Sequence, residues 1–288
     1  MKSAASNREP TARSDPGPVI PGGPPAANST VPSMQCLGLL GCDRSLLCTD
    51  YERHILREVA ERYAGQVTPH FVSLTMHVPA LVAAHQSTDR QELEHLVAAG
   101  VSALARLGAE AVVICTSVLQ PVVERMPSLQ PGSLMADTVV PVVSLPGRRR
   151  VAVIGAVDDQ EERYWRRRFI EFGRAEALFP VAADRAHMAR LIAEEFSRGV
   201  INETSRSDVR RIVYGLRQAG ARAFVLLSPA LDPVLPQADF VLPIFDATEL
   251  HALAAVDWAL GARSGIPLLR GLYSIQAPER GPVSVMAR

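Results

Sequence analysis

Two stretches of ten residues, one in each half of the chain, decide the fold. Residues 107–116 read Leu-Gly-Ala-Glu-Ala-Val-Val-Ile-Cys-Thr, and residues 219–228 read Ala-Gly-Ala-Arg-Ala-Phe-Val-Leu-Leu-Ser. Each holds a short apolar run between a helical pattern and small polar residues, which is typical of a buried parallel strand. Their likeness indicates that the chain contains two related α/β units.

The duplication extends to the start of each half, where Leu39–Gly41 matches Val153–Gly155. Gly41 precedes Cys115 by 74 positions, and Gly155 precedes Ser228 by 73. Ligands of open parallel sheets bind beyond the carboxyl ends of the strands. We therefore expect Cys115-Thr116 and Ser228-Pro229 to form opposite walls of one cleft.

Short apolar runs alternate with longer helical patterns from Gln35 onwards, which predicts an α/β protein with two similar lobes. The lobes would hold parallel sheets related by a pseudo-twofold duplication, with a cleft between them. We expect strands at Cys36–Leu40, His70–Leu74, Ala111–Ile114, Pro141–Leu145, Val151–Ile154, Ala177–Val181, Ala223–Leu227 and Val241–Phe245. We expect helices at Asp50–Tyr63, Arg90–Leu107, Ser117–Arg125, Gln160–Phe172, Arg185–Ser197, Ser205–Ala219 and Thr248–Leu260.

The composition of the terminal segments differs from that of the rest. Residues 1–34 are rich in Pro, Ser, Ala and Gly and predict a disordered tail. The predicted lobes are 35–147 and 148–246, followed by a helix at 247–261 that returns to the first lobe. Residues 262–288 are expected to form a loose tail.

Charge and cysteine content exclude several function classes. Lys+Arg and Asp+Glu balance at 30 each, so no net field favours nucleic acid or an anionic membrane. No signal-peptide pattern and no apolar run of roughly 20 residues is present, which predicts a soluble, cytoplasmic protein. The four cysteines lack the spacing of a zinc site, so we expect no metal.

Cys115 ends a predicted strand and is followed by Thr116, Ser117 and a predicted helix. Unpaired N–H groups and the helix dipole at such a position favour a thiolate and could hold a substrate carboxylate. The alternative is that Cys115 is a small buried apolar residue and that Thr116 or Ser117 only caps the helix. Local sequence leaves both interpretations open.

Over residues 35–261 the sequence resembles the aspartate/glutamate (and hydantoin) racemase superfamily. The residues that carry the resemblance are Leu37–Gly41, Val113–Ser117, Asp137-Thr138, Val151–Gly155, Glu194–Phe196, Gly199–Ile201, Phe245–Thr248 and His251-Ala252. The resemblance implies proton transfer at the α-carbon of a small carboxylate by two facing thiols, without pyridoxal or any other cofactor. It also implies that a homodimer is possible.

The chain departs from the family at two places. The family's second Cys-Thr-Glu falls on Ser228-Pro229-Ala230, where a neutral hydroxyl is a poor base and Pro229 removes a backbone N–H. Ser followed by Pro is also a good helix start, which is the alternative role for this pair. The loop after the first strand reads Cys42-Asp43-Arg44-Ser45 in place of the family's Gly-Met-Ser-Trp, and Cys48 takes a position where the family often has Thr.

These comparisons give a set of expected site residues. Cys115 and Ser228 are the candidate catalytic groups, and His251 and Asp246 are expected to support the site. His77 and His187 could face the cleft as proton donors, or be ordinary surface or core residues. The expected substrate-binding residues are Thr116, Ser117, Arg44, Ser45, Thr75 and Pro229.

Three functions remain open at this point. The first is a cofactor-independent racemase or isomerase acting on a small carboxylate such as aspartate or glutamate, with one base or two. The second is a single-thiol decarboxylase or cis–trans isomerase of a diacid. The third is a non-catalytic relative that binds a small anion.

Overall fold

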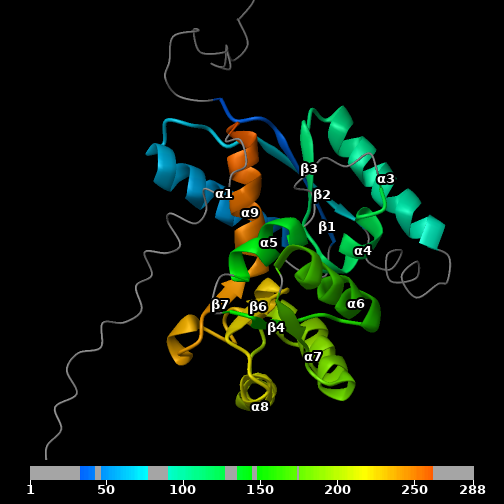
Figure 1. The fold of residues 1–288 in the computed structure, drawn as a ribbon. Helices are drawn as coiled ribbons and strands as arrows, with labels where there is room; N and C mark the ends of the chain where they lie inside the picture. Colours follow the sequence, from blue (N-terminus) through cyan, green and yellow to red (C-terminus); the bar gives the residue numbers. More distant parts are fainter. Residues whose placement is uncertain are drawn as a thin grey trace, which may run out of the picture. The chain divides into compact units, whose positions relative to one another are not determined.

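The computed structural model describes residues 33–42, 47–76, 90–126, 135–144, 148–173 and 175–261. Within these residues the strands form two parallel sheets (Figure 1). The first has the order β2-β1-β3 and the second β5-β4-β6-β7, which confirms the predicted α/β class with two sets of parallel strands. The strands are β1 (Leu37–Cys42), β2 (Phe71–Met76), β3 (Ala111–Ile114), β4 (Arg150–Ile154), β5 (Glu176–Leu178), β6 (Ala223–Leu226) and β7 (Ile244–Asp246).

Helices cover both faces of the first sheet. Figure 1 shows α3 on one side of the sheet and α1 and α9 on the other. Apolar side chains on the α3 side, among them Leu40, Val97 and Ile114, are fully buried and form one core cluster. The helical segments of this half are α1 (Leu47–Tyr63), α3 (Arg90–Arg106), η1 (Ser117–Leu119), α4 (Gln120–Val123) and α5 (Met135–Val143).

The second half has its own helices and core. Asp158 and Asn202 start α6 and α8, because their side chains accept hydrogen bonds from backbone N–H groups in the first turn. The segments are α6 (Asp159–Arg168), η2 (Phe169–Gly173), α7 (Ala182–Glu194), η3 (Phe196–Arg198), α8 (Glu203–Gln218), η4 (Pro229–Leu231), η5 (Gln237–Asp239) and α9 (Ala247–Ala259). The last of these, α9, packs against α1 and α5, and Ala259 O accepts a hydrogen bond of 2.8 Å from Gln35 N.

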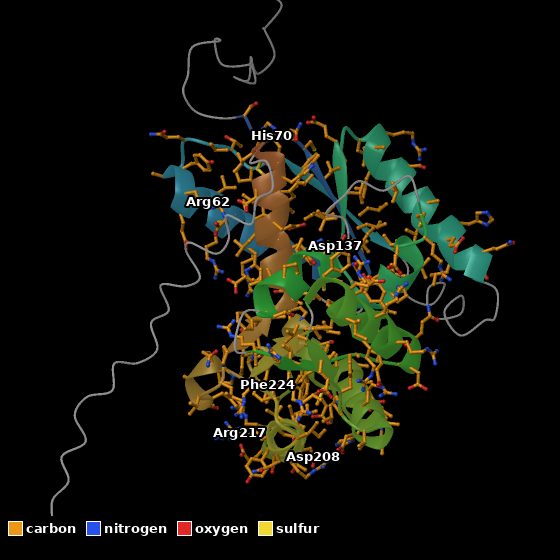
Figure 2. The ribbon with its side chains drawn as sticks, in the orientation of Figure 1. Arg62, His70, Asp137, Asp208, Arg217 and Phe224 are labelled. Atoms are coloured by element: carbon orange, nitrogen blue, oxygen red, sulfur yellow. The ribbon has the colours of Figure 1, made fainter. Side chains whose placement is uncertain are left out.

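Arg168, on α6, connects the two halves. Its side chain is only 8% exposed and forms ion pairs with Glu124 after α4, with Asp137 on α5, and with Glu171 in η2. Figure 2 labels Asp137, on α5. Because the guanidinium is buried, these carboxylates are needed to compensate its positive charge, and removing them would destabilise the fold.

The two halves share a backbone hydrogen bond at the end of corresponding strands. Cys115 N donates to Leu40 O at 2.8 Å, and Leu227 N donates to Ile154 O at the same distance. The residue after each donor begins a 3-10 turn with nearly the same backbone angles: Thr116 has φ −133° and ψ 132°, and Ser228 has φ −125° and ψ 125°. The duplication therefore equates Cys115 with Leu227 and Thr116 with Ser228, as the two ten-residue stretches align. It differs by one residue from the pairing of Cys115 with Ser228 that counting from Gly41 and Gly155 suggested.

Some predicted elements differ from those observed. The strand predicted at Pro141–Leu145 is wrong, because residues 141–143 belong to α5. Its valines suggested a strand, but packing against α9 and η2 outweighs that preference. The helix predicted at Ser117–Arg125 is instead a 3-10 turn followed by four α-helical residues. The last strand begins at Ile244, after Pro243, which has no N–H to donate to a ladder.

Candidate active site

The carboxyl ends of the three first-sheet strands meet at one edge. The parallel register pairs Gly41 with Thr75 and Leu40 with Ile114, and Cys115 N donates to Leu40 O. Gly41, Thr75 and Cys115 therefore stand side by side at the edge where parallel sheets bind ligands. We call Cys115, Thr75, Gly41 and the neighbouring Cys48 the thiol edge.

Cys115 is completely buried, and its Sγ lies 3.6 Å from the carbonyl oxygen of Val113, which it can reach as a donor. Thr116 and Ser117 are also buried, and the Thr116 side chain makes no hydrogen bond that caps η1. The helical segment that follows is short, so the dipole expected to act on Cys115 is weaker than the sequence suggested.

Gln120 fixes the backbone around Cys115, and sequence reasoning missed it. Its side chain is fully buried, and Nε2 donates to Ile114 O at 3.2 Å and to Thr116 O at 3.4 Å. Its Oε1 accepts from Met135 N at 2.8 Å, where α5 begins. The only sequence signal was a polar residue inside an apolar pattern.

Cys48, the second residue of α1, lies against the same edge and is 8% exposed. A Cβ atom placed on Gly41 would lie 2.5 Å from Cys48 Sγ and 3.7 Å from Cys115 Cβ, so the sulfur fills the space that the glycine leaves. A hydrogen bond from Cys115 is the largest influence that lowers the pKa of the Cys48 thiol, with burial opposing it. A further hydrogen bond from Thr75 lowers that pKa, and the Glu52 charge raises it.

A buried pair formed by Tyr51 and His251 supports the thiol edge from α1 and α9. Tyr51 Oη and His251 Nδ1 share a hydrogen bond of 2.7 Å, and both residues are fully buried. Burial, followed by the charges of Cys115, Asp246 and Cys48, raises the pKa of Tyr51 well above its usual range. The phenol therefore stays neutral beside the two sulfurs.

Carboxylates from both halves gather next to α1. Asp246 starts α9 by accepting from Thr248 N at 2.8 Å, and its other oxygen lies 3.7 Å from His54 Nε2. Burial raises the pKa of Asp50, and the charges of Asp246 and Asp232 add to that rise although Arg53 opposes it. Asp232, in the loop after η4, is exposed overall, but desolvation of its carboxyl and the Asp246 charge raise its pKa as well. The second half thus reaches α1 through Asp232.

The corresponding edge of the second sheet has no thiol. Leu227, equivalent to Cys115, is 3% exposed and apolar. Ser228 is half-buried, makes no side-chain capping bond, and precedes the buried Pro229. Gly155, the residue after β4, has φ 101°, and a Cβ there would lie 3.4 Å from Ser228 N. The backbone thus packs closely around a hydroxyl that occupies the same place as that of Thr116.

The remaining candidates are His187 and three residues that the structure does not describe. Arg44, Ser45 and His77 fall outside the described residues. His187 pairs at 2.9 Å with Asp208, labelled on α8 in Figure 2, and thus joins α7 to α8.

Among the residues that the structure describes, no group of three or more His, Cys, Asp or Glu could hold a metal ion. No helix in those ranges is long and apolar enough to cross a bilayer.

Comparisons with known proteins bear on the family. No protein-family model matches the sequence. The structure of a "putative Asp/Glu Racemase" from Yersinia pestis matches with a TM-score of 0.69 and 26% identity, over 79% of this chain and 100% of that chain. The chain therefore has the fold of the aspartate/glutamate racemases and resembles one of them in sequence.

Two further solved structures, of lower sequence identity, share the fold. An aspartate racemase homologue from Pyrococcus horikoshii matches with a TM-score of 0.64 and 18% identity, over 78% of this chain and 99% of that one. The aspartate racemase of Picrophilus torridus matches with a TM-score of 0.59 and 11% identity, over 79% and 94% of the two chains. The two-sheet architecture is therefore that of the racemase superfamily.

Proposed function

We propose that the protein is a cofactor-independent enzyme of the racemase and isomerase class that moves a proton at the α-carbon of a small carboxylate. Aspartate and glutamate are the first substrates to test, because relatives with this fold are described as acting on them. The observation that carries the proposal is the buried Cys115 thiol at the carboxyl edge of the first sheet. A thiolate there would take the α-proton as a base.

Hydroxyl groups on the two edges would orient the substrate. Thr116 and Ser228 occupy equivalent places at the starts of η1 and η4, and Ser117 is buried beside Thr116. Hydroxyls and the N–H groups of a first helical turn are suitable donors to a carboxylate. We therefore assign Ser228 to substrate binding, since a neutral hydroxyl is a poor base.

The proposal implies chemistry on one face of the substrate. The equivalent of Cys115 in the second half is Leu227, which can neither donate nor accept a proton. Proton removal by the first half would then be followed by return to the same face. The enzyme would exchange the α-proton with solvent faster than it inverts the configuration.

Exchange in deuterium oxide tests the proposal. We would incubate each enantiomer of aspartate and glutamate with the protein and follow loss of the α-proton by NMR. We expect exchange with at least one enantiomer and its loss in Cys115→Ala, by at least about 100-fold, the lower range for removal of a general base. Cys36→Ala is the matched control, because Cys36 precedes β1 at the opposite end of that strand. If no enantiomer exchanges, the amino-acid assignment is wrong.

Decarboxylation or cis–trans isomerisation of a diacid is the second candidate, and the apolar Leu227 favours it. After loss of carbon dioxide the electron pair stays on the α-carbon, and one thiol on one face is enough to protonate it. We would measure carbon dioxide release from substituted malonates and conversion of maleate to fumarate. Cys115-dependent turnover of a diacid, without α-proton exchange in amino acids, would select this candidate over the first.

A further inference from the structure

The thiol edge contains a second sulfur that family resemblance gave no reason to expect. We propose that Cys48 and Cys115 act as a pair that shares a single proton, with Cys48 carrying the negative charge in the resting enzyme. This inference rests on the proposed function for its role in catalysis, although the pair itself can be tested without substrate. It begins from the position of Cys48 Sγ, in the space above Gly41 and beside Cys115.

The two sulfurs lie in unequal surroundings. Cys48 is the second residue of α1, a helix of 17 residues, so it lies near the positive end of a long helix dipole. Cys115 precedes only a 3-10 turn and a four-residue helix. A negative charge is therefore better stabilised on Cys48 than on Cys115.

Hydrogen-bond donors further favour a negative charge on Cys48 over one on Cys115. The Cys115 thiol has one proton, which can turn from Val113 O at 3.6 Å toward the Cys48 sulfur; this hydrogen bond, and a second from Thr75, lower the pKa of Cys48. Glu52, one turn further along α1, opposes them with its charge, and burial opposes them as well. Tyr51 faces both sulfurs but stays neutral because its own pKa is raised. The two hydrogen bonds outweigh burial and the Glu52 charge, so the pKa of Cys48 falls below that of an ordinary thiol.

The pair gives the buried Cys115 a route to ionisation. The Cys115 S–H bond breaks as its proton moves to the Cys48 thiolate, and the Cys115 thiolate then takes the α-proton from the substrate. The pair now holds two protons, and the substrate carries the electron pair of the broken C–H bond. Return of a proton from Cys115 and of the Cys48 proton to Cys115 restores the resting state. Both sulfurs belong to the first-sheet edge, so the proton comes back to the face it left.

Ultraviolet absorbance of the thiolate, followed as a function of pH, tests the pair without substrate. We expect one thiolate to form below the ordinary thiol range in the native protein and to be lost in Cys48→Ala. In Cys115→Ala the pKa of the remaining Cys48 should rise, because a donor is gone, and Cys115→Ser should restore much of the shift. Cys36→Ala should leave this step unchanged. A low-pH step that survives Cys48→Ala, or one that Cys115→Ala does not move, overturns the inference.

The pH profile of exchange then tests the role of the pair in catalysis. We expect Cys48→Ala to lower the exchange rate by about 100-fold or more and to move the acidic limb of the profile upwards, since Cys115 must then ionise without an acceptor. Circular dichroism and an unfolding curve confirm that the variant is folded. If the native enzyme exchanges protons and Cys48→Ala keeps its rate and profile, the inference fails while the proposed function stands. If the native enzyme exchanges nothing, the proposed function fails, and the absorbance titration still decides whether the pair exists.

Discussion

Gly41→Ala would place a methyl group in the space that the Cys48 sulfur occupies at the thiol edge. The new Cβ would lie 2.5 Å from Cys48 Sγ, whereas unstrained non-bonded atoms stay about 3.5–4.0 Å apart. The sulfur must therefore withdraw by about 1 Å or more. The backbone nitrogen of Cys48 is 3.7 Å from the new atom, an ordinary contact, so the helix itself need not move.

The cost follows from these distances. Overpacking by one methyl group costs about 1–3 kcal/mol, and the lower entropy of the unfolded alanine chain returns up to about 1 kcal/mol. We expect a net loss of about 1–2 kcal/mol in the free energy of unfolding. Gly215→Ala on α8 is the matched control, because no atom lies within 4 Å of its Cβ, and it should gain about 0.5–1 kcal/mol.

Urea unfolding and the thiolate titration measure the two consequences. In Gly41→Ala the unfolding midpoint should fall, and the pKa of Cys48 should rise because the displaced sulfur loses the hydrogen bond from Cys115. Gly215→Ala should leave the titration unchanged. A Gly41→Ala protein with native stability and a native thiolate step would refute the packing of Cys48 against Gly41.

Three further predictions concern the frame around the site. Arg168→Leu should lose about 2–4 kcal/mol in urea unfolding, somewhat less than a fully buried pair, because Glu124 and Asp137 lose their partner but are partly exposed. Gly155→Ala should cost about 1–3 kcal/mol in the same measurement, since φ 101° strains any residue with a side chain. Burial raises the pKa of Asp50, so the folded protein holds this proton more tightly than the unfolded chain. The free energy of unfolding therefore falls as pH rises from below the ordinary carboxyl range through the raised pKa. Asp50→Asn should match the native protein in acid and exceed its unfolding midpoint at neutral pH; equal midpoints at both would contradict the desolvation of this carboxyl.

Local pattern was a good guide where strand and helix signals were strong. The strand at Ala111–Ile114 was predicted with the observed bounds, and the duplication appears in the backbone. The α5 segment was missed because a run of valines predicts a strand, while its helical state depends on partners far along the chain. Sequence could not supply these long-range contacts.

The site was only partly accessible from sequence. The position of Cys115 at the end of a strand was evident, whereas the proximity of Cys48 depends on how α1 meets β1 above Gly41. The pairing of Cys115 with Ser228 rested on positions counted from Gly41 and Gly155, whereas the strand register agrees with the direct alignment of residues 107–116 and 219–228, which pairs Cys115 with Leu227.

The steric course of α-proton exchange tests the central claim most directly. Each enantiomer of the substrate is incubated in deuterium oxide, separated by chiral chromatography and analysed by mass spectrometry. Chemistry confined to the thiol edge predicts deuterium in the starting enantiomer, with its configuration retained, and no exchange in Cys115→Ala. Accumulation of the deuterated opposite enantiomer as fast as exchange itself would contradict the account, because it requires a proton donor on the other face of the substrate, which the thiol edge does not supply.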